Sequence, residues 1–330
     1  MNKGILKLVI SILISSILFS CEKDEIEKVS PVKWTKYTTA DGLLSHNIHS
    51  IVVDSSDNIW VGTNMGVSRF DDSKWTNYTH FRGSPQVVTI AIDSNGDKWF
   101  GTFGGGIAKF DGVNWEYFQN DPKSSNSIAS DYIRSIAIDS KGNKWIGTDS
   151  NGVSKFDGTN WTNYTTENGL VHNTVYKITI DDQENKWFGT SGGVSKFDDN
   201  IWISYSYTGD KKNGITGNGV TGGIIMDKEG DMWFATFGGL SKFDGTNWTN
   251  YTTETEWLKA GSPVLSIAID NSGNKWFGSN GWGISNFDGT SWTTYKYIND
   301  ERIPPVNGIA FDSKGTKWFA TGSGLLKMEE

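Results

Sequence analysis

The chain has 330 residues, of which 13% are aromatic and 21% charged, and it contains 39 Gly, 16 Trp and only 6 Pro. This composition excludes an intrinsically disordered chain, and the length suffices for one large all-β domain or two smaller domains. The formal net charge of −8 argues against nucleic-acid binding, which depends on clustered Lys and Arg.

Residues 1–20 have the features of an export signal. Lys3 and Lys7 precede an apolar segment, residues 8–19 (LVISILISSILF), which is shorter than the roughly 20 residues of a membrane span. LFSC at residues 18–21 resembles a bacterial lipoprotein signal, which implies that Cys21 becomes the lipidated N-terminus after cleavage. An ordinary signal followed by a free Cys21 is the alternative. The mature chain would hold 28 basic and 38 acidic residues, a net charge of −10, and no other cysteine.

The residues after the cleavage site are polar and show no periodicity. CEKDE at residues 21–25 resembles the surface-export signal of Bacteroidetes lipoproteins, and a solvated charged tether is the alternative. We therefore expect a lipidated tether over residues 21–31 and a folded domain over 32–330. The expected location is the outer membrane, with the domain exposed at the cell surface or, alternatively, facing the periplasm.

The folded part is built from a repeat in which an Asp is followed six residues later by a Trp. The Trp residues recur at intervals of 39 to 46 residues, and a period near 43 with short β-like segments is typical of a β-propeller with one four-stranded blade per repeat. The seven pairs are Asp54 and Trp60, Asp93 and Trp99, Asp139 and Trp145, Asp181 and Trp187, Asp227 and Trp233, Asp270 and Trp276, and Asp312 and Trp318.

One repeat illustrates the four antiparallel strands expected in every blade. IRSIAID (133–139) is the inner strand, followed by NKWIGT, GVSKF and NWTNYT. Gly142 and the pair Asp157-Gly158 mark the hairpin turns. Asp57 and Glu184 replace Gly142 in two other repeats, and since Glu tolerates positive φ poorly, we expect a different turn at Glu184.

A second series of Trp opens the fourth strands, and it predicts how the ring closes. Six of these Trp follow the first series, but the seventh repeat ends at GSGLLKMEE without one. The missing strand is found at the other end of the chain, in KWTKYTT around Trp34. We expect this N-terminal strand to complete the last blade, which removes both exposed edges. The six Trp are Trp75, Trp115, Trp161, Trp202, Trp248 and Trp292.

NIHSIVVDSSDNIWVGTNMGVSRFD (47–71) and NTVYKITIDDQENKWFGTSGGVSKFD (173–198) resemble two-component regulator propeller repeats. The resemblance covers about residues 32–330. It implies an all-β, seven-bladed propeller of the kind that forms periplasmic sensor regions of hybrid histidine kinases, often glycan-responsive in Bacteroidetes. No kinase follows the repeats here, so a free-standing lipoprotein form is expected.

Candidate ligand-binding residues lie where the repeats differ. In a propeller, the loops between blades and those between the second and third strands share one face around the axis. Aromatic rings with polar neighbours on this face suit the stacking of sugars or the anchoring of a protein partner, although the same rings can simply cover the loops. The candidates are Trp257, Trp282, Phe103, Phe237, Arg134, Tyr132, Asp149, His172 and Tyr176.

No metal, cofactor or catalytic residue is predicted. His46 and His49 are three residues apart in an extended segment, so their side chains point to opposite faces, and no Ca²⁺-loop motif occurs. Turn formation is the simpler role for Asp139 and its equivalents.

The sequence thus predicts a lipid-anchored, sensor-like binding module, with a glycan as the expected ligand. A protein-interaction scaffold in an envelope complex is the alternative. A glycan lyase or hydrolase, in which His172 acts with Tyr176 or Arg134, is a third interpretation.

Overall fold

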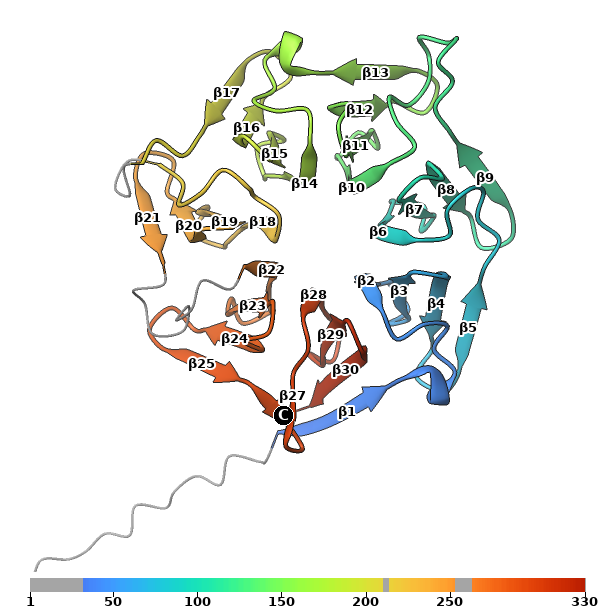
Figure 1. Ribbon diagram of the computed structural model, residues 1–330, viewed down its shortest axis with the longest axis vertical. Coiled ribbons are helices and arrows are strands. Elements are labelled where there is room, and N and C mark those ends of the chain that lie inside the picture. The colour runs from blue at the N-terminus through green and yellow to red at the C-terminus, as the bar shows by residue number, and fades with distance from the viewer. Residues whose placement is uncertain (1–31, 210–213, 253–262, 330) are drawn as a thin grey trace, which may run out of the picture. The chain divides into compact units, whose positions relative to one another are not determined.

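The computed structural model describes residues 32–209, 214–252 and 263–329. Within this part of the chain, seven four-stranded antiparallel sheets form the blades of a ring (Figure 1). The predicted seven-bladed β-propeller is therefore confirmed. No helix among the described residues is long and apolar enough to span a membrane.

Each blade has the same strand order from the centre outward. The innermost strands are β2 (Ile48–Val53), β6 (Val87–Ile92), β10 (Ile133–Ile138), β14 (Val175–Ile180), β18 (Gly223–Met226), β22 (Val264–Ile269) and β28 (Val306–Phe311). The second strands are β3 (Ile59–Thr63), β7 (Lys98–Thr102), β11 (Lys144–Thr148), β15 (Lys186–Thr190), β19 (Met232–Thr236), β23 (Lys275–Ser279) and β29 (Lys317–Thr321).

The third and fourth strands form the outer half of each blade. The third strands are β4 (Gly66–Phe70), β8 (Ile107–Phe110), β12 (Val153–Phe156), β16 (Gly193–Phe197), β20 (Gly239–Phe243), β24 (Ile284–Phe287) and β30 (Gly324–Glu329). The fourth strands are β5 (Trp75–Tyr78), β9 (Trp115–Phe118), β13 (Trp161–Tyr164), β17 (Trp202–Tyr205), β21 (Trp248–Tyr251), β25 (Trp292–Tyr295) and β1 (Lys33–Tyr37). Additional elements are the hairpin β26 (Tyr297–Ile298) and β27 (Glu301–Arg302) and the 3₁₀ turns η1 (Thr39–Asp41) and η2 (Thr166–Asn168).

The ring closes through the N-terminal strand, as expected. β1 pairs antiparallel with β30 over five residues, from Lys33 opposite Glu329 to Tyr37 opposite Leu325. Figure 1 shows β1 beside the C-terminal strands, where it completes the blade of β28, β29 and β30. Because β1 covers β30, the third strand of the last blade is not left with an unpaired edge.

The repeated Asp and Trp form a hydrogen bond in every blade. The indole N–H of the Trp on the second strand donates to the Asp carboxylate at 2.8–3.0 Å. In Asp139, the other carboxylate oxygen accepts backbone N–H bonds from Lys141 and Asn143, which fixes the turn between the first two strands. The motif therefore joins the turn to the buried Trp.

The same contacts explain the acidity of the repeated carboxylates. Burial alone would raise the pKa of Asp139, but the hydrogen bonds donated by Trp145 and Asn143 outweigh it and hold the pKa below 3.8. The pKa values of Asp54, Asp93, Asp227 and Asp270 are lowered in the same way. These carboxylates are therefore charged at neutral pH and serve as acceptors for the turn and the indole.

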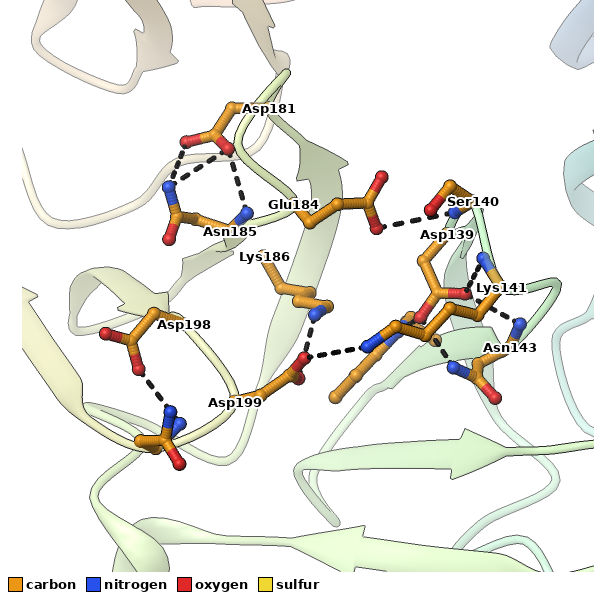
Figure 2. A network of polar contacts seen from close by, with 12 residues as sticks. Asp139, Ser140, Lys141, Asn143, Asp181, Glu184, Asn185, Lys186, Asp198 and Asp199 are labelled. Carbon is orange, nitrogen blue, oxygen red and sulfur yellow. Dashed lines mark hydrogen bonds and ion pairs between the residues drawn. The ribbon is translucent and has the colours of Figure 1, made fainter.

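The expected difference at Glu184 is wrong. Glu184 adopts φ 65° and donates its N–H to Asp181 at 2.9 Å, as Gly142 does to Asp139. Its carboxylate accepts a hydrogen bond from the backbone N–H of Ser140 in the preceding blade, shown in Figure 2. Asp57, at φ 61°, makes the equivalent bond with Ser313. A contact between blades thus accompanies the strained backbone at both positions.

The hydrophobic core consists of clusters between neighbouring blades. Each cluster contains a second-strand Trp from one blade and apolar side chains from the next; Trp145, for example, packs with Val175 and Phe188. In five of these interfaces a Lys of the next blade lies over the Trp ring, at 4.7–5.8 Å from the centroid. Lys186 is one of them, and its amine also pairs with Asp199 at 2.8 Å (Figure 2). The blade interfaces are therefore both aromatic and charged.

Candidate functional site

A β-bulge interrupts the inner strand of six blades at its second residue. The pairing with the second strand skips one residue, for example between Val175 and Lys177. A bulged residue is left unpaired, and its side chain is re-aimed. The skipped residues are His49, Val88, Arg134, Tyr176, Leu265 and Asn307.

All six bulged residues line one cavity on the ring axis, which we call the axial cavity. It has a volume of about 470 Å³ and is completed by Gln86, Phe103, Lys177 and Thr221. Every blade contributes at least one of these side chains. A second cavity of about 200 Å³, the inner channel, shares His49, Val88, Lys177 and Asn307 with it and continues along the inner strands. The volume of the axial cavity lies in the range of small-molecule sites, roughly 300–1,000 Å³.

Lys177 is the exception in a ring of small residues. It stands four residues before the repeated Asp, where the other blades carry Ser50, Thr89, Ser135, Gly223, Ser266 and Gly308. Its side chain lines both cavities. Among the described residues, no hydrogen bond or ion pair involves its amine. Burial lowers the pKa of Lys177 below 10.5, and the positive charge of Arg134 lowers it further.

Arg134, in contrast, is paired. Its Nε and Nη2 lie 2.7 and 2.6 Å from Oδ1 of Asp149. The guanidinium also lies over the rings of Phe103 and Tyr176, at 4.6 and 5.7 Å from their centroids. Asp149 thus offsets the charge of Arg134, while the two rings hold it in place.

The remaining polar groups of the cavity are an imidazole, two side-chain amides and a hydroxyl group. The ring of His49 contacts the side-chain amides of Asn64 and Gln86. The Asn307 amide donates to the carbonyl of Ile48 at 2.8 Å. Two buried hydroxyl oxygens have no hydrogen-bond partner among the described residues: Thr221 Oγ1, whose residue lines the axial cavity, and Ser50 Oγ, whose residue lines the inner channel. Such groups are costly unless something binds them.

The structure brings only some of the predicted binding residues together. Phe103, Arg134 and Tyr176 line the axial cavity, and Asp149 holds Arg134. Tyr132 packs against Phe103, with ring centroids 5.2 Å apart.

The other predicted residues lie elsewhere. Trp282 lies under Lys296, 4.9 Å from its ring centroid, and Phe237 is 58% exposed on the loop after β19. His172 is exposed, its Nδ1 accepting a hydrogen bond from the N–H of Thr174, and it does not join Tyr176 and Arg134 in the cavity. Trp257 and Cys21 fall outside the described residues. No group of three His, Cys, Asp or Glu able to hold a metal occurs among those described.

Sequence reasoning missed Lys177, Thr221, Gln86 and Asn307, and it considered His49 only as a metal ligand. An alignment of the seven repeats on the Asp would have revealed Lys177, because a long charged side chain there replaces Ser, Thr or Gly in every other blade.

The family model described as "Two component regulator propeller" matches residues 42–65 and 214–238. These matches support the expected relationship of this chain to the two component regulator propeller family. No curated protein matches the sequence of this chain.

Similar solved structures show the same fold. The extracellular domain of the putative hybrid two component system BT3049 from B. thetaiotaomicron is 19% identical, with a TM-score of 0.78 over 91% of this chain and 42% of that one. A streptogramin B lyase is 15% identical (TM-score 0.72; 90% and 97% covered). PorZ from Porphyromonas gingivalis is 16% identical (TM-score 0.70; 87% and 47%). The propeller thus spans less than half the length of the BT3049 domain and of PorZ.

Proposed function

We propose that this chain is a ligand-binding propeller with a sensor-like role at the cell envelope, and that its ligand, a glycan, binds in the axial cavity. The observation that carries the proposal is the lining of that cavity. Side chains from all seven blades converge there, and Thr221 Oγ1 has no hydrogen-bond partner among the described residues. Lys177, which lines the same cavity, forms no hydrogen bond or ion pair with its amine in the part of the chain that the structure describes. Tyr176 and Phe103 offer aromatic ring surface, and Gln86 and Asn307 offer side-chain amides. A sugar can pack its ring on the aromatic surface and form hydrogen bonds between its hydroxyl groups and the amides.

The cellular context is part of the proposal. Similar structures are described as extracellular domains of two component systems, which supports a sensor-like role outside the cytoplasm. The signal and LFSC sequence at residues 1–21 favour an outer membrane lipoprotein anchored through Cys21 and exposed at the surface.

The proposal is tested by blocking the cavity. We expect thermal-shift screening of residues 22–330 against oligosaccharides to find a stabilising ligand, since a ligand at 100 times its dissociation constant adds roughly 2.7 kcal/mol. Val88→Trp, which places an indole in the cavity, should abolish that shift. Val113→Trp, at a position that is 83% exposed, is the matched control and should leave it intact. Equal shifts in both variants would place the ligand elsewhere.

A protein-interaction scaffold is the second candidate, and one feature of the fourth blade favours it. Its outer edge strand β17 exposes Ile203 (46%), at the position where β13 and β21 carry Thr162 and Thr249, and Ile201 (60%) lies beside it. PorZ is described as a surface component of a secretion system. Crosslinking in cells to a defined envelope protein, lost on Ile203→Thr, would support this role.

A further inference from the structure

We propose that the axial cavity recognises an acidic sugar, and that its carboxylate is bound by Lys177. This inference rests on the proposed function and names the ligand class. The first argument is placement: Lys177 lines both the axial cavity and the inner channel, and the equivalent positions of the other blades carry small side chains.

The second argument is the charge around the amine. No Asp or Glu is among the described residues that line either cavity, although the whole chain carries a net charge of −8. The charged side chains that line the axial cavity are therefore basic, Arg134 and Lys177, in a protein that is acidic as a whole. The titratable groups that face Lys177 are Arg134 on β10, His49 on β2 and Tyr176 beside it on β14, and Arg134 is already paired with Asp149. Lys177 is therefore the basic side chain of the cavity that lacks an acidic partner among the described residues, and a bound carboxylate would supply the opposite charge and favour its charged form.

The third argument is the surrounding neutral chemistry. A bare anion would be satisfied by cations and N–H donors alone, but this cavity adds the rings of Tyr176 and Phe103 and the hydroxyl group of Thr221. Amides and hydroxyl groups pair with sugar hydroxyls, and ring surface packs on the C–H face of a sugar. A carboxylate attached to a sugar ring, as in a uronic acid, uses all three kinds of group.

The test compares two probes of equal length, trigalacturonic acid and its fully methyl-esterified form, by isothermal titration calorimetry. We expect the unmodified chain to prefer the acid, with an affinity that falls as NaCl is raised. Lys177→Met should weaken binding of the acid roughly 10- to 150-fold, the range for losing a hydrogen bond to a charged group, and should remove the preference and the salt dependence. Lys177→Arg, which keeps the charge, should retain both.

The controls separate this inference from the proposed function. Lys141→Met makes the same charge change at a turn at the far end of the inner strands, and it should bind like the unmodified chain. If Lys177→Met binds the acid normally while Val88→Trp does not, binding in the cavity stands and carboxylate recognition by Lys177 is overturned. If the unmodified chain binds neither trisaccharide, this inference falls, while the proposed function is still decided by the wider oligosaccharide screen. If only a peptide carboxyl terminus binds through Lys177, the sugar class is wrong.

Discussion

A chain lacking residues 32–38 should lose most of its thermal stability, because these residues supply the strand that closes the ring. β1 pairs with β30 along its whole length, so its removal exposes the backbone groups of β30. It also removes two aromatic side chains from the closing interface. Trp34 lies 5.8 Å from Phe319, and Tyr37 lies 5.0 Å from Phe70 and 6.1 Å from Trp318, measured between ring centroids.

The expected loss is comparable to the whole stability of an ordinary domain. Truncating a packed aromatic residue costs about 3–5 kcal/mol, and two such losses approach the 5–15 kcal/mol by which domains are typically stable. We expect the melting temperature, followed by circular dichroism, to fall by about 10–20 °C, or the chain not to fold. A chain beginning at residue 32 is the control. An unchanged melting temperature after the deletion would contradict closure by β1.

Replacement of Trp145 should have the second largest effect. Trp145 is fully buried between the third and fourth blades. Its indole N–H donates to Asp139 at 3.0 Å, and the amines of Lys155 and Lys186 lie 5.1 and 5.2 Å from its ring centroid. Trp145→Ala would leave a cavity, an Asp139 carboxylate short of a donor, and two Lys without their aromatic surface. We expect a cost of about 3–5 kcal/mol, measured by urea unfolding.

Trp145→Phe separates the two parts of that cost. Phe keeps most of the apolar volume but cannot donate to Asp139, so we expect a smaller loss of about 1–2 kcal/mol. If Ala and Phe were equally destabilising, the hydrogen bond would dominate. If neither lowered stability by more than 0.5 kcal/mol, the Asp and Trp repeat would not be the structural unit described above.

The fold could be predicted because its determinants repeat within the chain. The Asp and Trp at a fixed spacing recur near every 43 residues, and each copy meets the same neighbours, so seven weak local patterns support one architecture. Seven repeats are followed by only six fourth strands, and this difference is enough to predict closure by Trp34 and its neighbours. The turn at Glu184 could not be predicted, because the bond that accompanies its positive φ comes from Ser140 in another blade.

The site could be predicted only in part, for reasons that lie in strand geometry. Phe103, Arg134 and Tyr176 were candidates because they differ between repeats near one face. Which side chains reach the axis depends on the bulges, and these shift the simple two-residue alternation of a strand. If the bulges are not known, nothing distinguishes Lys177 from the many other Lys residues of the chain that contact Trp or Asp. The half-buried Trp282 and the exposed Phe237 have the right chemistry but lie outside the cavity.

The most direct test of ligand binding in the axial cavity is protection of Lys177 from acylation. An N-hydroxysuccinimide ester labels accessible amines, and peptide mass spectrometry measures each Lys separately. We predict that trigalacturonic acid at saturation lowers the labelling of Lys177 several-fold and leaves Lys141 unchanged. Undiminished labelling of Lys177, with protection of Lys residues elsewhere, would contradict the placement of the ligand on the propeller axis.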